Sequence, residues 1–384
     1  MEEIDIIIVG GGICGLATAL AFHRKGIKSV VFEKSESLRA TGAGITIRTN
    51  GWRALDQLGV GSKLRKTALP VKGIGAETRC LRRSDLITSL AESLPHGTVH
   101  LGCQILSVTQ DSPTSYPIIQ LQNGSVIKAK VLIGCDGANS VVADFLGLKP
   151  PKFFSLSEVR GFTEYPSGHD FNNEFVQVWG ENSIIGRIPM DNKLVYWFVT
   201  QKMNTKGTGS MVAKDPELIH QRTLESIKDF PTELIGMIRN CDRESVSWAR
   251  LRHRAPWDIL LGSFQKGTVA VAGDAMHVMG PFLGQGGAAC IEDAIVLARC
   301  LAQKMHEIDA KTKERLVIMH KVGEGLDQYV KERRMRLVWL TTQTYLCSLL
   351  VETPGLLVEL LCTILLMVLF RDSTAHTQYD CGRL

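Results

Sequence analysis

The chain has 384 residues, 45% of them hydrophobic and 22% charged, which is typical of a folded globular protein and excludes a disordered one. The formal net charge is only +5, and the densest basic cluster (Lys331, Arg333, Arg334 and Arg336) also contains Glu332, so we interpret it as a solvated helix face. Because nucleic-acid binding needs a concentrated basic footprint, this charge pattern argues against it.

The cysteines and histidines show no pattern of a disulfide framework or a metal site. The ten cysteines never occur as C-x-x-C, which favours a reducing compartment. His96 and His100 have a spacing that metal ligands can have, but Pro95 and Gly97 indicate a turn, so we predict no metal site. The first predicted strand begins at Ile4, and we therefore expect no targeting segment and a cytoplasmic location.

The first motif follows an apolar run near the amino terminus. Residues 5–9 predict a strand buried on both faces, and they lead into Gly10-Gly-Gly-Ile-Cys-Gly15 and a helical pattern over 16–25. Residues 29–32 predict a second strand, which ends at Glu33. This strand–turn–helix–strand unit is typical of a Rossmann-type dinucleotide site.

The three glycines at positions 10, 12 and 15 and the acidic residue that ends the second strand each have a physical task in dinucleotide binding. Gly10 allows the tight turn, Gly12 lets a pyrophosphate approach the backbone, and Gly15 lets the helix pack on the strand. The phosphates then lie at a helix amino terminus, where free N–H groups and the helix dipole favour negative charge. Glu33 is placed to accept hydrogen bonds from the ribose hydroxyls.

Two later segments also end a buried strand on a turn rich in Gly and Asp. The first runs from Val131 through Gly134 and Asp136 to a helix that Ser140 can cap. The second runs from Gly267 to Asp274 and continues as Pro281-Phe-Leu-Gly-Gln-Gly-Gly287 into another helix. Since ligands bind at the carboxyl ends of strands in open α/β sheets, the three segments together predict a site for FAD.

Between these two segments, residues 150–261 change to a pattern of strands at 175–179, 183–188 and 193–199. We predict a sheet that covers the flavin, of which only one face can line the substrate pocket. The candidate pocket residues are Trp179, Arg187, Tyr196 and Phe198. For each of the three aromatic residues taken alone, a place in the core of the sheet is favoured over a place in the pocket. For Arg187 alone, a position facing solvent is favoured. No side chain is identified as a catalytic base, and for His277 we favour a structural hydrogen bond over a catalytic role.

The carboxyl-terminal part, residues 331–384, is predicted to consist of helices and a tail. Residues 337–350 indicate one helix, and the strongly apolar residues 356–370 indicate another. The second is shorter than the roughly 20 residues that span a bilayer, and Glu359 would be costly in its interior. We expect it to pack on the core or to lie at an interface, and peripheral membrane contact through 356–370 remains open.

Taken together, these motifs resemble those of the single-component (group A) FAD-dependent aromatic monooxygenases, the family of p-hydroxybenzoate and salicylate hydroxylases. The likeness is greatest to plant FAD-dependent monooxygenases and covers nearly the whole chain. Its residues are the dinucleotide motif with Glu33, the "DG" segment 134–140, the "GD" segment 273–287, Arg83, and the tail 376–382. The resemblance implies a glutathione-reductase-like, p-hydroxybenzoate hydroxylase fold. It consists of an FAD-binding domain (1–149 and 262–330), an inserted β-sheet substrate domain (150–261), and a carboxyl-terminal helical segment (331–384).

The resemblance also implies roles for individual residues. Asp274 would hold the ribityl chain, and residues 284–287 would present backbone N–H groups to the pyrimidine edge of the flavin. Pro281 would lie beside the ring near the oxygen-reacting carbon, and residues 41–45, with Gly44, would run along its other side. The full set of predicted cofactor contacts is Gly10, Gly12, Gly15, Glu33, Gly44, Arg48, Arg83, Asp136, Asp274, Pro281, Gly284, Gln285, Gly286 and Gly287.

Two of these assignments stay open at the level of sequence. Arg48 would touch FAD phosphate or NAD(P)H, or form a surface salt bridge instead. Asp136 would contact a ligand or organise its turn. Ala143 stands where the family often has an arginine, which puts the carried-over NAD(P)H contact in doubt.

The activity implied by the resemblance is hydroxylation of a small aromatic or phenolic substrate. NAD(P)H, a transient co-substrate without a domain of its own, would reduce FAD, and O2 would form a flavin hydroperoxide that transfers oxygen. The alternatives are an oxidase, dehydrogenase or epoxidase on the same fold, or a flavin-binding protein without activity. We expect a monomer or homodimer.

Overall fold

Apolar runs separated by glycine turns build the larger of two main sheets, in which β1 is the central strand. The computed structural model describes residues 2–38, 44–72, 77–203, 215–308, 314–353, 355–372 and 374–384. The strand order is β14-β15-β8-β1-β2-β5, with β7 paired to β8 and β6 to β7. The strands are β1 (Glu2–Val9), β2 (Val30–Phe32), β5 (Val99–His100), β6 (Ile105–Gln110), β7 (Pro117–Leu121), β8 (Val126–Gly134), β14 (Gln265–Lys266) and β15 (Val269–Val271).

The parallel strands of this sheet end in register. Val9 of β1 pairs with Phe32 of β2 and with Gly134 of β8, which in turn pairs with Val271 of β15. The three motif segments therefore begin at one edge of the sheet, as the sequence predicts, because parallel strands deliver their carboxyl ends to the same side.

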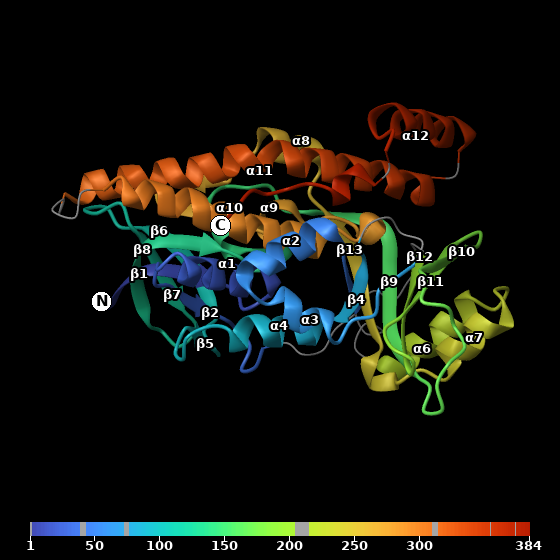
Figure 1. The fold of residues 1–384 in the computed structure, drawn as a ribbon. Helices are drawn as coiled ribbons and strands as arrows, with labels where there is room; N and C mark the ends of the chain where they lie inside the picture. Colours follow the sequence, from blue (N-terminus) through green and yellow to red (C-terminus); the bar gives the residue numbers. More distant parts are fainter. Residues whose placement is uncertain are drawn as a thin grey trace.

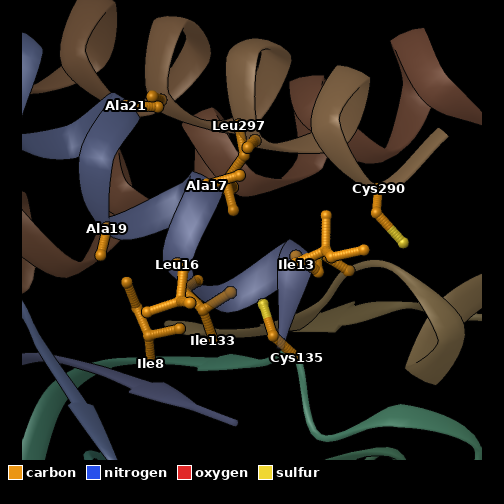
Figure 2. Packing of buried hydrophobic residues seen from close by; sticks show 14 of the residues in the cluster. Ile8, Ile13, Leu16, Ala17, Ala19, Ala21, Ile133, Cys135, Cys290 and Leu297 are labelled. Atoms are coloured by element: carbon orange, nitrogen blue, oxygen red, sulfur yellow. The ribbon is translucent and has the colours of Figure 1, made fainter. Parts of the chain in front are cut away.

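Three long helices stack over one face of this sheet. They are α1 (Ile13–Arg24), α10 (Gly286–His306) and α11 (Arg315–Glu352), with α1 packed on α10 and α10 on α11 (Figure 1). In Figure 2, Leu16 lies beside Ile8 and Ile133 of the sheet, and the small Ala17 faces Leu297 of α10. The shorter helices are α2 (Thr49–Leu58), α3 (Gly61–Arg65), α4 (Arg83–Glu92), α5 (Val141–Phe145), α8 (Pro256–Leu261) and α9 (Asp274–His277).

The second main sheet is antiparallel, with strand order β10-β11-β12-β9-β13. One of its faces is covered by α6 (Pro216–Ser226) and α7 (Thr232–Arg239), whose Ile219 and Leu234 join a core with Trp197. A two-stranded sheet, β3 (Gly44–Ile47) with β4 (Arg79–Arg82), completes the strands. The bounds in the second sheet are β9 (Lys152–Glu164), β10 (Val176–Trp179), β11 (Ser183–Pro189), β12 (Leu194–Lys202) and β13 (Ser247–His253).

The α/β fold class and the predicted strands are confirmed, but the carboxyl-terminal part differs in detail. Residues 337–350 form the end of α11, which is one helix of 38 residues rather than a separate element. It is followed by α12 (Leu356–Leu369), which packs on α11 and in which Cys362 alone is buried, so of the two expected placements a core helix is not what the structure shows. Within the described ranges, none of the helices is long and apolar enough to cross a bilayer.

Candidate cofactor and substrate site

A single cavity of about 920 Å³ joins the carboxyl ends of the parallel strands to the open face of the second sheet. Its volume is at the upper end of the roughly 300–1,000 Å³ usual for small-molecule sites. Most of the residues predicted to contact the cofactor line it: Gly10, Gly12, Glu33, Gly44, Arg48, Arg83, Asp136, Asp274, Pro281, Gly284, Gly286 and Gly287.

The first turn has the backbone that a pyrophosphate site needs. Gly10 has φ +105°, and a Cβ there would lie 2.5 Å from the carbonyl oxygen of Cys135, so the turns after β1 and β8 are in contact. A Cβ on Gly12 would meet no atom within 4 Å, which leaves open space at the amino terminus of α1. Gly15 does not line the cavity, because it faces the carbonyl oxygen of Gly10 where α1 packs on the strand.

Glu33 is held at the end of β2 by two backbone donors. The N–H groups of Gly11 and Ser35 donate to its Oε2 and Oε1 at 2.6 and 2.9 Å. The carboxylate is buried and lines the cavity, so its orientation is fixed before a ligand binds. Its remaining lone pairs are those that can accept ribose hydroxyls.

Asp136 organises its turn, and it is also placed where it could contact a ligand. Its Oδ2 accepts the N–H of Val141 at 2.8 Å and thereby organises the turn. Its Oδ1 is buried, has no hydrogen-bond partner among the described residues, and belongs to a side chain that lines the cavity. Burial raises the pKa of Asp136 above its usual value, which is the environment of a group waiting for a polar partner.

The third segment surrounds the start of α10. Asp274 is exposed towards the cavity, while Pro281, Gly284, Gly286 and Gly287 line it at the amino terminus of this 21-residue helix. Free N–H groups and the helix dipole at this position favour negative charge on a ligand. The side chain of Gln285 is turned away and buried, and its Oε1 accepts from Asn50 at 2.8 Å.

The two predicted arginines and Gly44 also reach the cavity. Arg48 precedes α2, is half-buried and lines the cavity, and burial lowers its pKa. Arg83 begins α4 and lines the cavity. A Cβ on Gly44 would lie 2.6 Å from the ring of Tyr196, which brings β3 directly against the second sheet. Residues 41–43 lie outside the described ranges.

In the second sheet, alternation decides which predicted pocket residues reach the cavity. Tyr196 and Phe198, two residues apart on β12, line it, as does Trp179 of β10. Arg187 does not: it lies on the opposite face, with its guanidinium 4.1 Å from the ring centroid of Phe171. The prediction for Arg187 is therefore wrong, because its neighbours Ile184 and Ile188 take the cavity side of β11.

This face also carries an ion pair that was not predicted from the sequence, in which Glu158 is buried and Arg160 is half-buried. Glu158 and Arg160 of β9 line the cavity and form a salt bridge with each other, and Thr200 Oγ1 donates to Glu158 Oε2 at 3.1 Å. Burial alone would lower the pKa of Arg160, but the Glu158 carboxylate raises it above its usual value. The sequence does contain a signal for this pair, because two charged residues, two positions apart, lie on a strand face that is otherwise apolar.

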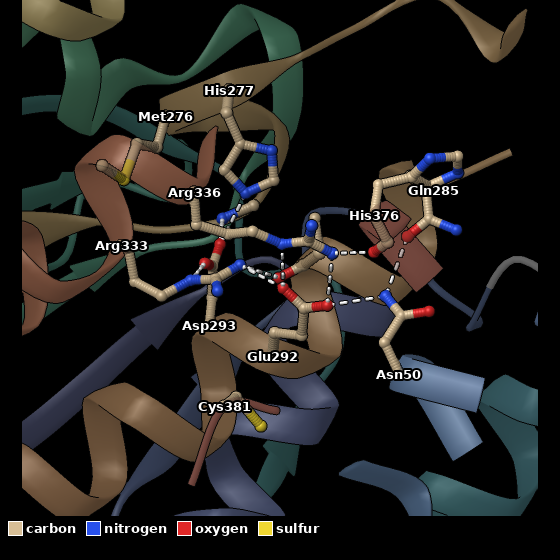
Figure 3. A network of polar contacts seen from close by, with 12 residues as sticks. Asn50, Met276, His277, Gln285, Glu292, Asp293, Arg333, Arg336, His376 and Cys381 are labelled. Carbon is tan, nitrogen blue, oxygen red and sulfur yellow. Dashed lines mark hydrogen bonds and ion pairs between the residues drawn. The ribbon is translucent and has the colours of Figure 1, made fainter. Parts of the chain in front are cut away.

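A second polar network, buried in the core, lies next to the predicted flavin-binding segment, residues 273–287 (Figure 3). Asp293 accepts from the backbone of Gly273 at 2.9 Å, from His277 Nε2 at 2.6 Å and from Arg333 Nε at 2.7 Å. Glu292 pairs with Arg333 and Arg336, and Asn50 Nδ2 donates to Glu292 Oε1 at 2.6 Å. His277 thus makes a structural contact, as favoured above.

The same network corrects the interpretation of the basic cluster in α11. Arg333 is fully buried between two carboxylates of α10, and Arg334 donates to backbone carbonyls at the end of α8. Only Lys331 has a strongly exposed side chain paired on the helix surface, with Asp327. The cluster is not a solvated face, because residues 100° apart on a helix point to different neighbours.

The fold and the convergent strand ends define a two-sheet flavoprotein that binds a dinucleotide beside a substrate cavity. The sequence matches the FAD binding domain family over residues 3–96 and 84–343, and the chain belongs to this family. It is 48% identical to Monooxygenase 1 of Arabidopsis thaliana, with 100% of both chains covered. It is 35% identical to Monooxygenase 2 of the same plant, with 99% of this chain and 98% of that protein covered. The protein is accordingly an FAD-dependent monooxygenase.

Solved structures with this fold are more distant in sequence. HpxO from Klebsiella pneumoniae, complexed with FAD and uric acid, has a TM-score of 0.79 at 18% identity, with 98% and 97% of the two chains covered. A salicylate hydroxylase substrate complex has a TM-score of 0.70 at 20% identity, with 100% and 99% covered. At these identities the likeness establishes the fold alone.

Proposed function

We propose that this enzyme hydroxylates a small aromatic or phenolic molecule at the expense of NAD(P)H and O2. The observation that carries the proposal is the single cavity, which has dinucleotide-binding turns at one end and an aromatic and charged sheet face at the other. Bound FAD would supply electron transfer from NAD(P)H and activation of O2. In the balanced reaction, the substrate C–H becomes C–OH, and the second oxygen atom leaves as water with two electrons from the nicotinamide.

The cofactor contacts are proposed from positions that already fit the group. Gly12 leaves space for the pyrophosphate, Glu33 is oriented towards the ribose site, and Asp274 is exposed to the cavity for the ribityl hydroxyls. The amino terminus of α10 would face the pyrimidine edge, where negative charge collects on reduction. Gln285 would contribute its backbone only, since its side chain is bonded to Asn50.

The substrate wall is proposed to be the open face of the second sheet. Tyr196 and Phe198 would hold an aromatic ring, and Arg160 would attract its phenolate or carboxylate group. Glu158 fixes the guanidinium of Arg160, so the wall contributes a positioned donor rather than a mobile charge. Burial raises the pKa of Tyr196 well above its usual value, so it remains neutral and cannot act as a base near neutral pH.

The test is oxidation of NADH and NADPH by the purified holoenzyme, with and without hydroxybenzoates and other phenols. Stimulated consumption of NAD(P)H and O2 with one oxygenated product is expected. Arg160→Met should raise KM for an acidic phenol by at least tenfold, about 1.4 kcal/mol, and leave bound FAD unchanged. Oxidation of the organic substrate by O2 with no nicotinamide required would assign an oxidase instead.

A further inference from the structure

The outer side of the carboxyl-terminal region carries an unusual apolar helix. Nine side chains of α12 are at least 43% exposed: Leu356, Leu357, Leu360, Leu361, Ile364, Leu365, Met367, Val368 and Leu369. At 100° per residue these side chains cover a continuous arc of about 220° around the helix. Glu359, its single charge, lies outside this arc, on the side that carries the buried Cys362. We call the exposed arc the apolar face of α12.

The apolar face is too wide for the usual contact between a helix and one protein surface. An amphipathic helix that packs on a protein presents a stripe of about 100° or somewhat more, so half of this face would remain in water. A strongly apolar segment of 14 residues that is not a core helix is instead typical of an interfacial membrane segment. Its length of about 21 Å fits a position parallel to the membrane surface.

The surroundings of α12 have the chemistry of the zone between lipid chains and headgroups. Trp339 of α11 is 47% exposed and contacts Phe370 edge-on, with ring centroids 5.6 Å apart. Arg371 is exposed and lies two residues after the end of α12. A groove of about 860 Å³ lies between α11 and the end of α12, and its wall includes Leu340, Val368 and Leu369. Aromatic rings and cations at the edge of an apolar surface favour the membrane interface.

The cavity reaches the part of α11 on which α12 packs. Cys347 and Leu350, near the end of α11, line the cavity, and α11 and α12 are in contact. In Figure 1, α12 lies over the end of α11 on the outside of the molecule, and the side chains of its apolar face are exposed. From these observations we propose that α12 is a monotopic membrane contact, lying in the interface of a phospholipid bilayer.

The experiment is cosedimentation of the full-length holoenzyme with sucrose-loaded vesicles of phosphatidylcholine, alone or mixed with phosphatidylglycerol. Wild-type protein should sediment with both, and more with the anionic mixture. The double variant Leu361→Glu and Leu365→Glu should bind at least tenfold more weakly. Its matched control is Leu101→Glu with Leu106→Glu, because these two leucines are 42% and 51% exposed against 51% and 43% for the α12 pair.

Both variants should keep the FAD content and melting temperature of the wild type, since all four leucines are exposed. Fluorescence of Trp339, isolated as the difference from a Trp339→Phe variant, should shift to shorter wavelength on vesicles and be quenched by brominated lipid. Failure of the wild type to bind either vesicle would overturn the proposal. Equal vesicle binding by the α12 variant and the control variant would also overturn it. A wild-type dimer in light scattering without lipid, which does not bind vesicles and which the α12 substitutions dissociate, would instead assign the apolar face to a second copy of the chain.

Discussion

The guanidinium of Arg333 is fully buried and faces two carboxylates on adjacent positions of α10. Burial alone would raise the pKa of Glu292, but Arg333 and Arg336 hold it below its usual value. His277 and Arg333 do the same for the pKa of Asp293. Asp293 also accepts the N–H of Gly273, so an ionised carboxylate fixes the start of the predicted flavin-binding segment, residues 273–287.

Replacing Arg333 with Met should reveal how much this network stabilises the protein. The change removes one of the two cations that face each carboxylate, leaving Asp293 with His277 and Glu292 with Arg336. Removing one partner of a buried ion pair costs about 3–5 kcal/mol in comparable sites. The measurement is the free energy of unfolding in urea, with Lys331→Met as the control. Lys331 lies on the same helix with a side chain 75% exposed, so its loss should change stability by less than about 0.5 kcal/mol. An Arg333→Met protein as stable as the control would refute a structural role for the network.

His253, at the end of β13, should make stability depend on pH. Its ring is buried, stacks on Phe154 at 4.2 Å, and has a pKa lowered by burial and then by Lys152 to about 4. Since the unfolded chain takes up this proton near pH 6.5 and the folded protein does not, stability is complete above pH 6.5 and falls as the pH drops towards 4.

The loss can reach roughly 3 kcal/mol for a shift of this size. Urea unfolding between pH 7.5 and 4 should show a shallower slope in His253→Phe, which keeps the stacked ring but has no proton to gain. The same slope in both proteins would assign the pH dependence to other groups.

At the scale of elements, the turn between β1 and α1 leaves a space at Gly12 that no described protein atom fills. A Cβ on Gly12 would touch no protein atom within 4 Å, although the residue begins a helix at the cavity. The proposed pyrophosphate would occupy this space, since free N–H groups at a helix start bind phosphate.

Gly12→Ala should therefore fold with an unfolding free energy within about 1 kcal/mol of wild type, the range for changes at a helix start. Its affinity for FAD, measured by flavin fluorescence titration of the apoprotein, should fall at least tenfold. Gly236→Ala is the matched control, because a Cβ there, in α7, also meets no atom within 4 Å. FAD affinity unchanged in Gly12→Ala would place the pyrophosphate elsewhere.

For the whole molecule, the tail 374–384 ties three helices together. Its backbone carbonyls accept from Arg53 of α2, Arg299 of α10 and Arg336 of α11 at 2.8, 2.6 and 2.6 Å. The ring of Tyr379 lies under the guanidinium of Arg336, 4.4 Å from its centroid. Because Asn50 lies in α2 and Arg48 directly precedes this helix, the tail links the surface of the molecule to the predicted cofactor segments.

Deletion of residues 374–384 should lower the unfolding free energy by roughly 3–5 kcal/mol, at about 1 kcal/mol per lost hydrogen bond together with the buried contacts. FAD should dissociate several-fold faster, as measured by recovery of flavin fluorescence. Arg383→Ala, which removes an exposed side chain of the same tail, should change neither value. A truncated protein that melts with the wild type would show that the tail contributes nothing to the fold.

The sequence by itself determined the three strand-to-turn segments and hence the class of cofactor, because each is a local pattern of apolar strand, glycine turn and helix. It named Trp179, Arg187, Tyr196 and Phe198 as candidates without deciding which of them face the cavity, and it missed Glu158 and Arg160. The face of a strand depends on which residues pair across the sheet. The tertiary structure alone decided that Arg333 is buried and α12 exposed. Both outcomes depend on contacts between helices far apart in the chain, and burial cannot be read from the composition of one segment.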